Sequence, residues 1–348
     1  MPKNNPTFIE RHAGPPKPQK KVVGSLLDTM QDGREYQSLI DVVPVPDMNV
    51  GAELRRAIKD IEDIRKHPLV VYVGNVIKAS DGNEIAYSDD LPFSEMIDSV
   101  PTTDSLDILI VTPGGLAQQV SQFVNRFRPK FNNVSMILPY MAMSAGTIWA
   151  LSGNEIWMDE RANIGPIDPQ VIGKDGRFVP AQAILALLKR IQEDGEENIK
   201  KGQAPAWSDR LILQNMDPKE LGNAISQSQY SIQLATEYLK NYKFRDWKVH
   251  IHDGTPVTPE QLAARAAEVA GRLCSHEYWK VHSHGISREV AWAELKLKIE
   301  HPESVPDFSR AIRRFWALMY WLFESSQLTK MFVSQQFMLF KSSTTPTH

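Results

Sequence analysis

The chain has 348 residues, 42% of them hydrophobic, and a formal net charge of −3. It can therefore bury a substantial core, and its composition excludes a disordered protein and gives no reason to expect nucleic-acid binding. The single cysteine, Cys274, excludes an internal disulfide and a cysteine cluster for zinc or iron–sulfur, which suits a reducing compartment and predicts a cytoplasmic protein.

Two segments bear on targeting to a membrane. Residues 1–22 are basic and proline-rich without an apolar core, so we expect a flexible tail rather than a signal peptide or an anchor. Residues 315–323 are apolar and aromatic, but they are only about half of the roughly 20 residues that span a bilayer. We expect a buried or oligomer-facing helix there, with an interfacial membrane helix as the alternative.

Helices and strands are predicted to alternate from residue 51 onward. In chain order the patterns predict a helix over 51–66, a strand over 69–73, a short helix over 89–100, a strand over 106–111, a helix over 116–127, a strand over 134–139, a helix over 144–152 and a strand over 155–158. This rhythm predicts an α/β fold with a parallel sheet and right-handed crossovers. The second half is predicted to be mainly helical, over 181–191, 208–215, 218–242, 259–273, 287–299 and 308–329.

Two turns that follow predicted strands hold the parts of an acyl-transfer site. The first contains Gly114 and Gly115, and the second contains Ser144 followed by Ala145. We expect Ser144 to be the nucleophile and the backbone N–H groups of Gly115 and Ala145 to hold an oxyanion, with Gly114 in the same oxyanion and substrate-binding turn. The plainer interpretations are a helix N-cap for the serine and an ordinary tight turn for the glycines.

Several separated motifs give the sequence a family resemblance. They are Thr112-Pro113-Gly114-Gly115-Leu116, Met143-Ser144-Ala145-Gly146-Thr147, Asp159 and Gly165-Pro166-Ile167-Asp168-Pro169-Gln170, with a weaker echo over 279–295. With these motifs the sequence resembles the serine dehydrogenase proteinase family of the Clp protease/crotonase superfamily, and more distantly the relatives of signal peptide peptidase A. Ala145 stands where the family more often has glycine, and alanine can still donate its N–H.

The resemblance implies a Clp protease/crotonase-like fold with a parallel β-sheet core and a mainly helical C-terminal part. We expect a flexible tail over 1–22, the peptidase domain over 45–300, a C-terminal extension with an aromatic helix over 301–340, and a polar tail over 341–348.

The general base is not evident from the sequence. No histidine lies between His67 and His250, so the histidine that follows the serine in Clp-type proteases is missing. The resemblance to signal peptide peptidase relatives points to a lysine, with Lys201 ahead of Lys200, although both lie in a charged stretch that is typical of an exposed surface. Asp168 can orient a base or act on the nucleophile, or it can be a turn residue before a proline. His282 is a further base candidate.

The spacing of His282 and His284 could suit metal ligands, but no acidic partners are spaced with them, and a structural role is the simpler interpretation. An α/β-hydrolase elbow around Ser144 is a rival hypothesis, although it leaves the glycine turn unexplained. A crotonase-like acyl-CoA enzyme without a serine nucleophile is a second rival, and a catalytically weak or inactive oligomeric scaffold is a third.

The sequence thus predicts a serine endopeptidase without metal or nucleotide cofactor, acting on peptides or proteins. The resemblance implies a homo-oligomer. Because the chain has no Gly-x-x-x-x-Gly-Lys phosphate loop, any unfoldase or regulator would be a separate partner.

Overall fold

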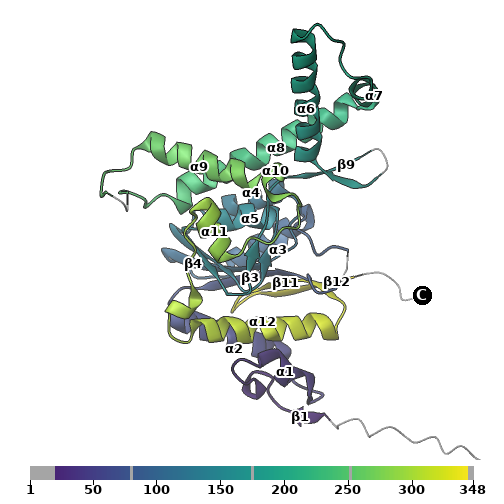
Figure 1. Ribbon diagram of the computed structural model, residues 1–348. Helices are drawn as coiled ribbons and strands as arrows, with labels where there is room; N and C mark the ends of the chain where they lie inside the picture. Colours follow the sequence, from purple (N-terminus) through teal and green to yellow (C-terminus); the bar gives the residue numbers. More distant parts are fainter. Residues whose placement is uncertain (1–19, 79–80, 174–175, 251–252, 344–348) are drawn as a thin grey trace, which may run out of the picture.

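The computed structural model describes residues 20–78, 81–173, 176–250 and 253–343. Most of the predicted tails over 1–22 and 341–348 lies outside these residues. A six-stranded sheet with the order β12-β11-β3-β4-β5-β7 forms the centre of the molecule (Figure 1). Its strands are β3 (Leu69–Gly74), β4 (Ser105–Val111), β5 (Asn133–Leu138), β7 (Glu155–Met158), β11 (Leu328–Val333) and β12 (Met338–Ser342).

The predicted parallel sheet is confirmed for its central strands. Strands β3, β4, β5 and β7 pair in parallel in sequence order. The connecting helices are α3 (Asp90–Asp98), α4 (Ala117–Phe127) and α5 (Ala145–Leu151). The carboxyl ends of the strands therefore meet at one edge, where an open α/β sheet binds its ligands. The glycine turn follows β4 and the serine turn follows β5 at this edge.

The last two strands differ from the sequence prediction. The helix expected over 308–329 ends four residues earlier, as α12 (Phe308–Ser325), and the chain then forms a hairpin. Strand β11 pairs antiparallel with β3, and β12 pairs antiparallel with β11. The C-terminal segment is therefore part of the central sheet as well as an aromatic helix.

Side chains alternate between two cores on the two faces of the sheet. On β3, Val71 and Val73 pack with α12 and α2 (Val50–Arg65), whereas Val70 and Tyr72 pack on the other face. Figure 1 shows α12 and α2 on one side of the sheet, with α1 (Glu35–Ile40) beyond them, and the other helices on the opposite side. The aromatic helix α12 is thus buried within its own chain, as one of the two sequence interpretations predicted.

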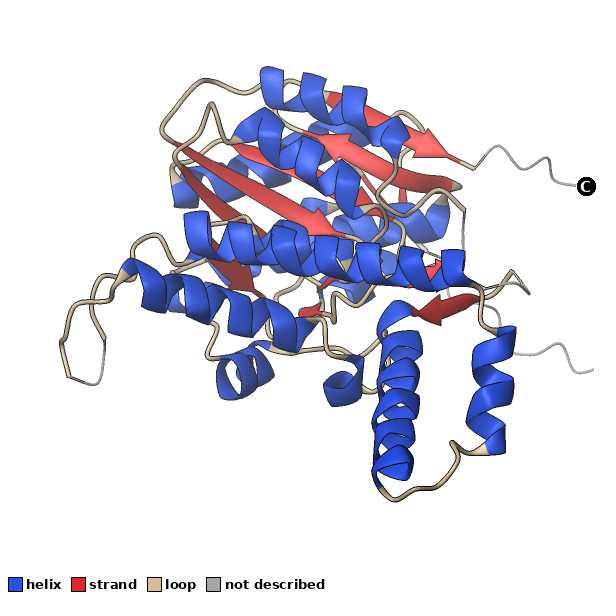
Figure 2. Cartoon of the chain, turned by 90° about the horizontal axis from the view of Figure 1, so that it is seen from above, coloured by secondary structure: helices blue, strands red, loops and turns tan. Residues whose placement is uncertain are grey.

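The second half of the chain is mainly helical, as predicted. Its helices are α6 (Ala181–Lys200), α7 (Trp207–Asn215), α8 (Pro218–Tyr238) with a π-helical turn (Leu239–Lys243), α9 (Pro259–Leu273), α10 (His276–Trp279) and α11 (Arg288–Leu295). Both views show α6 and α7 standing away from the body as a hairpin (Figures 1 and 2). None of the helices within the described ranges is both long enough and apolar enough to cross a membrane.

Short two-stranded pairs and 3-10 turns complete the fold. The pairs are β1 (Lys21–Val23) with β2 (Val42–Pro44), β6 (Met141–Ala142) with β8 (Asn163–Ile164), and β9 (Gln170–Ile172) with β10 (Phe178–Pro180). The 3-10 turns are Leu27–Thr29, Tyr87–Asp89 and Pro302–Ser304. The β6–β8 pair matters most for the site, because β6 leads directly into the serine turn and β8 into the Gly-Pro-Ile-Asp-Pro loop.

Candidate active site

Thr112 holds the two predicted turns side by side. Its N–H donates to the carbonyl of Met141 at 2.9 Å, and its own carbonyl accepts from the N–H of Met143 at 3.1 Å. These bonds form an isolated parallel bridge beside Ala142. The glycine turn after β4 and the serine turn after β5 therefore meet at the carboxyl end of the sheet.

The glycine turn has a backbone that only glycine adopts easily. Gly114 and Gly115 have φ angles of 113° and 133°. A Cβ on Gly114 would lie 2.9 Å from the Cβ of Ser144, and one on Gly115 would lie 2.3 Å from the carbonyl oxygen of Ile85. The turn is thus packed against the serine on one side and against residue 85 on the other.

The two N–H groups of this turn differ in their hydrogen bonds. Gly114 donates its N–H to Thr112 Oγ1 at 3.1 Å, so it supports the turn and is not a free oxyanion donor. Ile85 brackets the next residue, because its N–H donates to Gly114 O at 2.7 Å and its carbonyl accepts from Leu116 N–H at 2.9 Å. The N–H of Gly115 between them has no hydrogen-bond partner within the part of the chain that the structure describes.

Ser144 has a strained backbone and a side chain that does not cap the helix. Its φ and ψ are 52° and −116°, immediately before α5. A non-glycine residue in such a sparsely populated region costs on the order of 1–3 kcal/mol, and such strain gathers at active sites. Ser144 occupies the N-cap position, as the plainer interpretation predicted, but its hydroxyl makes no capping hydrogen bond. Ala145 is the first residue of α5, where helix geometry leaves the N–H without an intrahelical partner.

Thr147 joins the serine turn to the Gly-Pro-Ile-Asp-Pro loop. Its buried Oγ1 lies 2.8 Å from Ala142 O and 3.0 Å from Gly165 O, and it accepts the N–H of Gly165 at 2.8 Å. Farther along the loop, the N–H of Ile167 donates to Leu273 O at 3.0 Å. The loop is therefore fixed both to α5, which begins directly after Ser144, and to the end of α9.

The loop presents a buried carboxylate to two histidines. Asp168 is fully buried, and its Oδ1 lies 2.8 Å from Nδ1 of His282. Its Oδ2 lies 3.5 Å from Nδ1 of His276, which is longer than a good hydrogen bond. Asp168 thus fixes the ring of His282 by a bond to Nδ1 and leaves Nε2 as the nitrogen that can serve a reaction.

His282 and Ser144 face the same pocket. The pocket has a volume of about 870 Å³, and its walls also include Gly115 and Ala145. No hydrogen bond joins Ser144 to His282 among the described residues. Catalytic hydrogen bonds are often long or absent without substrate and form when the substrate binds. The serine, the histidine with its buried carboxylate, and the two residues expected to donate to an oxyanion therefore surround one space.

The lysines predicted as bases are not brought to this pocket. Lys201 caps the end of α6, is exposed, and pairs with Glu197 at 2.6 Å. Lys200, at the last position of α6, is also exposed, and neither lysine lines the pocket. The reason is that α6 runs for 20 residues, about 30 Å, in the hairpin that leaves the body (Figure 2). The number of residues between Ser144 and these lysines could be read from the sequence, but the direction of α6 could not.

The remaining candidates take structural roles. His284 packs its ring against Trp279 at 5.3 Å between centroids. Among the residues that the structure describes, no three His, Cys, Asp or Glu side chains gather closely enough to hold a metal. Cys274 lies in the core, where burial, with a further contribution from the charge of Asp168, raises the pKa of its thiol to about 12. This thiol therefore stays protonated and unreactive at neutral pH.

A segment in the middle of the chain is similar to a known protein family. Residues 83–203, about a third of the 348, match the model of the ClpP-like SDH-type serine proteinases. Over this segment the chain is similar to that family. The matched segment contains Gly115, Ser144 and Asp168, but it ends before His282.

Two curated relatives come from Methanocaldococcus jannaschii, the uncharacterized proteins MJ0137 and MJ1495. The first is 28% identical over 179 residues, which are 50% of this chain and 56% of the relative. The second is 30% identical over 175 residues, which are 49% and 53% of the two proteins. The chain spans little more than half the length of these curated relatives.

Solved structures give more distant matches. A mutant of the 1510-N membrane-bound stomatin-specific protease in complex with a substrate peptide aligns at 15% identity with a TM-score of 0.37, over 62% of this chain and 70% of that one. ClpP1 from Listeria monocytogenes aligns at 11% identity with a TM-score of 0.34, over 71% and 94%. The α/β fold with a parallel-dominated sheet is that predicted for a Clp protease/crotonase-like protein.

Proposed function

We propose that this protein is a serine peptidase that uses Ser144 as the nucleophile and His282 as the general base. The observation that carries the proposal is the 2.8 Å contact between His282 Nδ1 and buried Asp168, in the wall of the pocket that holds the strained serine. A carboxylate bonded to Nδ1 sets the tautomer in which Nε2 can accept a proton. In this proposal His282 replaces Lys201.

The reaction follows from these roles. Ser144 Oγ attacks the peptide carbonyl carbon while its proton passes to His282 Nε2, and the N–H groups of Gly115 and Ala145 hold the resulting oxyanion. The C–N bond then breaks, and the leaving amine takes the proton from His282. Water then attacks the acyl carbon while its proton passes to His282 Nε2. The ester C–O bond breaks, Ser144 Oγ takes the proton back from His282, and the acid product leaves. Asp168 stays ionised and stabilises the imidazolium that forms between these steps.

The pocket walls support a peptide with apolar side chains. They include Leu116, Ile148, Ile167 and Phe178 beside the serine. Burial of such side chains contributes about 25 cal/mol per Å² of apolar area removed from water. Homo-oligomeric assembly, a separate unfoldase and a cytoplasmic location remain predictions from the sequence.

A set of three variants tests the assignment. We expect Ser144→Ala and His282→Gln to lose on the order of 10³-fold or more in kcat/KM on a fluorogenic apolar peptide, because members of a triad act as a unit. Lys201→Ala, with its exposed ion pair, serves as the control and should keep wild-type kinetics. Circular dichroism confirms that each variant is folded.

Labelling by a fluorophosphonate separates an enzyme with a serine nucleophile from an acyl-CoA enzyme or an inactive scaffold. The wild-type protein should react, and Ser144→Ala should not. An acyl-CoA enzyme or an inactive scaffold predicts no labelled serine at all. The proposal is contradicted if Ser144→Ala hydrolyses the peptide at the wild-type rate. It is also contradicted if Lys201→Ala loses activity while His282→Gln keeps full activity.

A further inference from the structure

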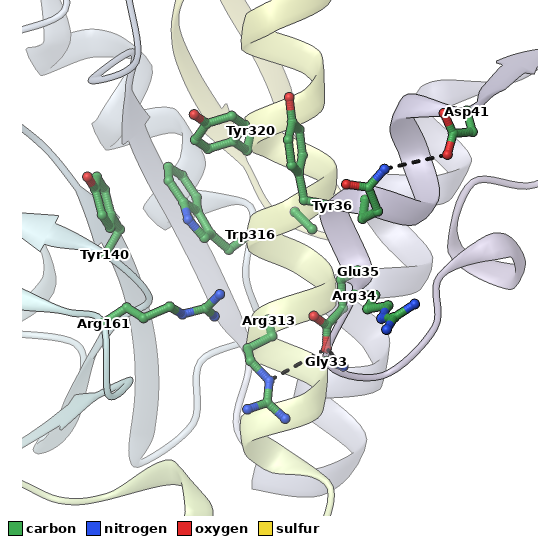
Figure 3. A pocket seen from close by; sticks show the side chains of 12 residues that line it. Gly33, Arg34, Glu35, Tyr36, Asp41, Tyr140, Arg161, Arg313, Trp316 and Tyr320 are labelled. Atoms are coloured by element: carbon green, nitrogen blue, oxygen red, sulfur yellow. Dashed lines mark hydrogen bonds and ion pairs between the residues drawn. The ribbon is translucent and has the colours of Figure 1, made fainter.

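A second pocket lies on the opposite face of the sheet from most of the helices, beside α12. It has a volume of about 880 Å³ and lies between α12, α1 and the residues that follow β5 and β7 (Figure 3). None of the groups assigned to catalysis lines it. Its lining combines aromatic rings with guanidinium groups, a pairing that the proposed peptidase reaction does not use.

Four aromatic rings form a continuous wall. Trp316 stacks on Tyr140 with centroids 5.5 Å apart and an angle of 20° between the rings. Tyr320 meets Trp316 edge-on at 5.9 Å, and Tyr36 meets Tyr320 edge-on at 4.8 Å. Because Trp316 is almost fully buried and anchored in α12, this wall is a rigid surface on which a planar group can lie.

Three arginines with spare donors share the pocket. Arg161 uses its Nε for Asp159 at 2.8 Å, and Arg313 has its Nε 3.6 Å from buried Glu35. The Nη groups of these two side chains, and the whole guanidinium of Arg34, have no hydrogen-bond or ion-pair partner within the described residues. Figure 3 shows Arg161 beside Tyr140 and Trp316, whereas Arg313 and Arg34 lie near Gly33 and Glu35.

Acidic groups near the pocket are fewer and are partly engaged. Glu35 is buried and accepts the N–H of Gly33 at 2.9 Å, and Asp41 lies 3.5 Å from the side chain of Gln37. Glu324 accepts the hydroxyl of Tyr36 at the far end of the wall. The guanidinium groups therefore outnumber the carboxylates among the lining residues, and the planar donor fork of arginine matches phosphate and carboxylate oxygens.

We infer that this pocket binds a small aromatic anion, with its ring on the tyrosine and tryptophan wall and its phosphate or carboxylate between the arginines. Arginine also stacks on aromatic planes, so the same side chains can hold both ends of such a ligand. A volume of about 880 Å³ lies within the usual range for small-molecule sites.

Two lining residues connect this pocket to the catalytic segments. Tyr140 immediately precedes β6 and lies four residues before Ser144, and Arg161 lies two residues before β8 and seven before Asp168. The N–H of Asn163 in β8 donates to Tyr140 O at 2.8 Å, so the two segments are joined at the pocket wall. A ligand held between α12 and these residues therefore contacts the chain just before both segments, and we expect its binding to alter the proposed peptidase activity, an effect that rests on the proposed function.

Calorimetry on the full chain tests binding independently of activity. The probes are adenosine 5′-monophosphate and indole-3-acetate, which carry a ring with a phosphate or a carboxylate. Their separate halves are adenosine and inorganic phosphate for the first, and indole and acetate for the second. We expect at least one of the two aromatic anions to bind with a Kd below about 1 mM and more than about tenfold tighter than either half, since two linked contacts add their free energies. The difference between the phosphate and carboxylate arms identifies the source of the anion.

Arg34→Ala is the diagnostic variant, because its side chain is exposed and has no structural partner among the described residues. It should weaken binding of the aromatic anion by about tenfold through loss of a charge-assisted contact. Arg310→Ala is the matched control on α12, where Arg310 pairs with Asp307 at 3.0 Å and does not line the pocket. It should leave the Kd unchanged.

Binding should be the same in Ser144→Ala, so a failure of the peptidase proposal would leave this result intact. The coupling is then measured as a change in kcat/KM of the wild-type protein at saturating ligand. Absence of binding by both aromatic anions up to about 5 mM, or equal weakening by Arg310→Ala and Arg34→Ala, overturns the inference.

Discussion

Lys330 in β11 is the side chain whose removal should most disturb the fold near the active site. Its side chain is 1% exposed, and its Nζ lies 2.7 and 2.9 Å from the two carboxylate oxygens of Asp89 and 2.7 Å from Glu84 O. Asp89 is also fully buried and accepts from the hydroxyl of Tyr72 at 2.9 Å and from Lys341 Nζ at 2.8 Å. The C-terminal hairpin is thereby fixed to the segment that brackets Gly115.

Lys330→Met removes one cation and leaves a buried carboxylate. Breaking a buried ion pair from one side typically costs about 3–5 kcal/mol, because the remaining charge loses its compensation. Lys341, whose side chain is 26% exposed, still faces Asp89, so we expect the lower end, about 3 kcal/mol of the free energy of unfolding. Adding Asp89→Asn should recover about 1 kcal/mol or more, since the double variant no longer buries an unpaired charge.

Urea denaturation followed by circular dichroism measures these differences. Lys59→Met is the control, because its ion pair with Asp63 lies on the surface, and the variant should unfold at the wild-type urea concentration. If Lys330→Met costs less than about 1 kcal/mol with an unchanged denaturant slope, the cluster does not stabilise the native state as reasoned. If the double variant loses more free energy of unfolding than the two single variants lose together, the carboxylate is held by its neutral donors rather than by Lys330.

Two further predictions concern a backbone position and a buried amine. Gly115→Ala would place a methyl group 2.3 Å from Ile85 O, so we expect kcat/KM to fall by about 10²-fold or more. Gly222→Ala is the control, because there is open space around its Cβ, and it should keep full activity. Equal kinetics in the two variants would contradict the oxyanion role of Gly115. Burial lowers the pKa of Lys243 from 10.5 to about 8. Between these pH values the unfolded chain therefore binds more protons than the folded one, so the free energy of unfolding should rise with pH. Relative to Lys243→Met, the rise in the wild-type protein should be at most about 3 kcal/mol. Denaturation of both proteins at pH 7 and pH 11 measures this difference, and a fall with pH would show that the amine is not desolvated.

Local patterns were sufficient for the central sheet and for the position of the turn that holds the proposed nucleophile. The apolar runs that became β4, β5 and β7 and the helices between them were predicted within one or two residues, because each element buries a face that its own sequence marks. Ser144 and Gly115 could be proposed as site residues for a similar reason, since each lies in a short motif directly after a strand. Their chemistry depends on residues close to them in the chain.

Long-range partners could not be predicted in the same way. His282 lies 138 residues after Ser144 and reaches the same pocket only because Asp168 and the loop after α10 meet in space. The lysines were at a suitable distance in sequence, but a straight helix carries them away. Strand β11 was not predicted because Lys330 interrupts its apolar pattern. The partner of that buried cation, Asp89, is distant in sequence and reaches Lys330 only in the folded protein.

The position of β11 also sets the order in which the molecule can be completed on the ribosome. Strand β3 needs β11 as its second neighbour, yet 184 residues separate Ser144 from Leu328, the first residue of that strand. At about 5–20 residues per second, synthesis of this stretch takes roughly 9–37 s. During that interval the serine turn exists without the strand that anchors the wall beside Gly115. The nascent chain therefore carries the proposed nucleophile, Ser144, well before the strand that supports the segment beside Gly115, and the proposed site is complete only when nearly the whole protein has been made.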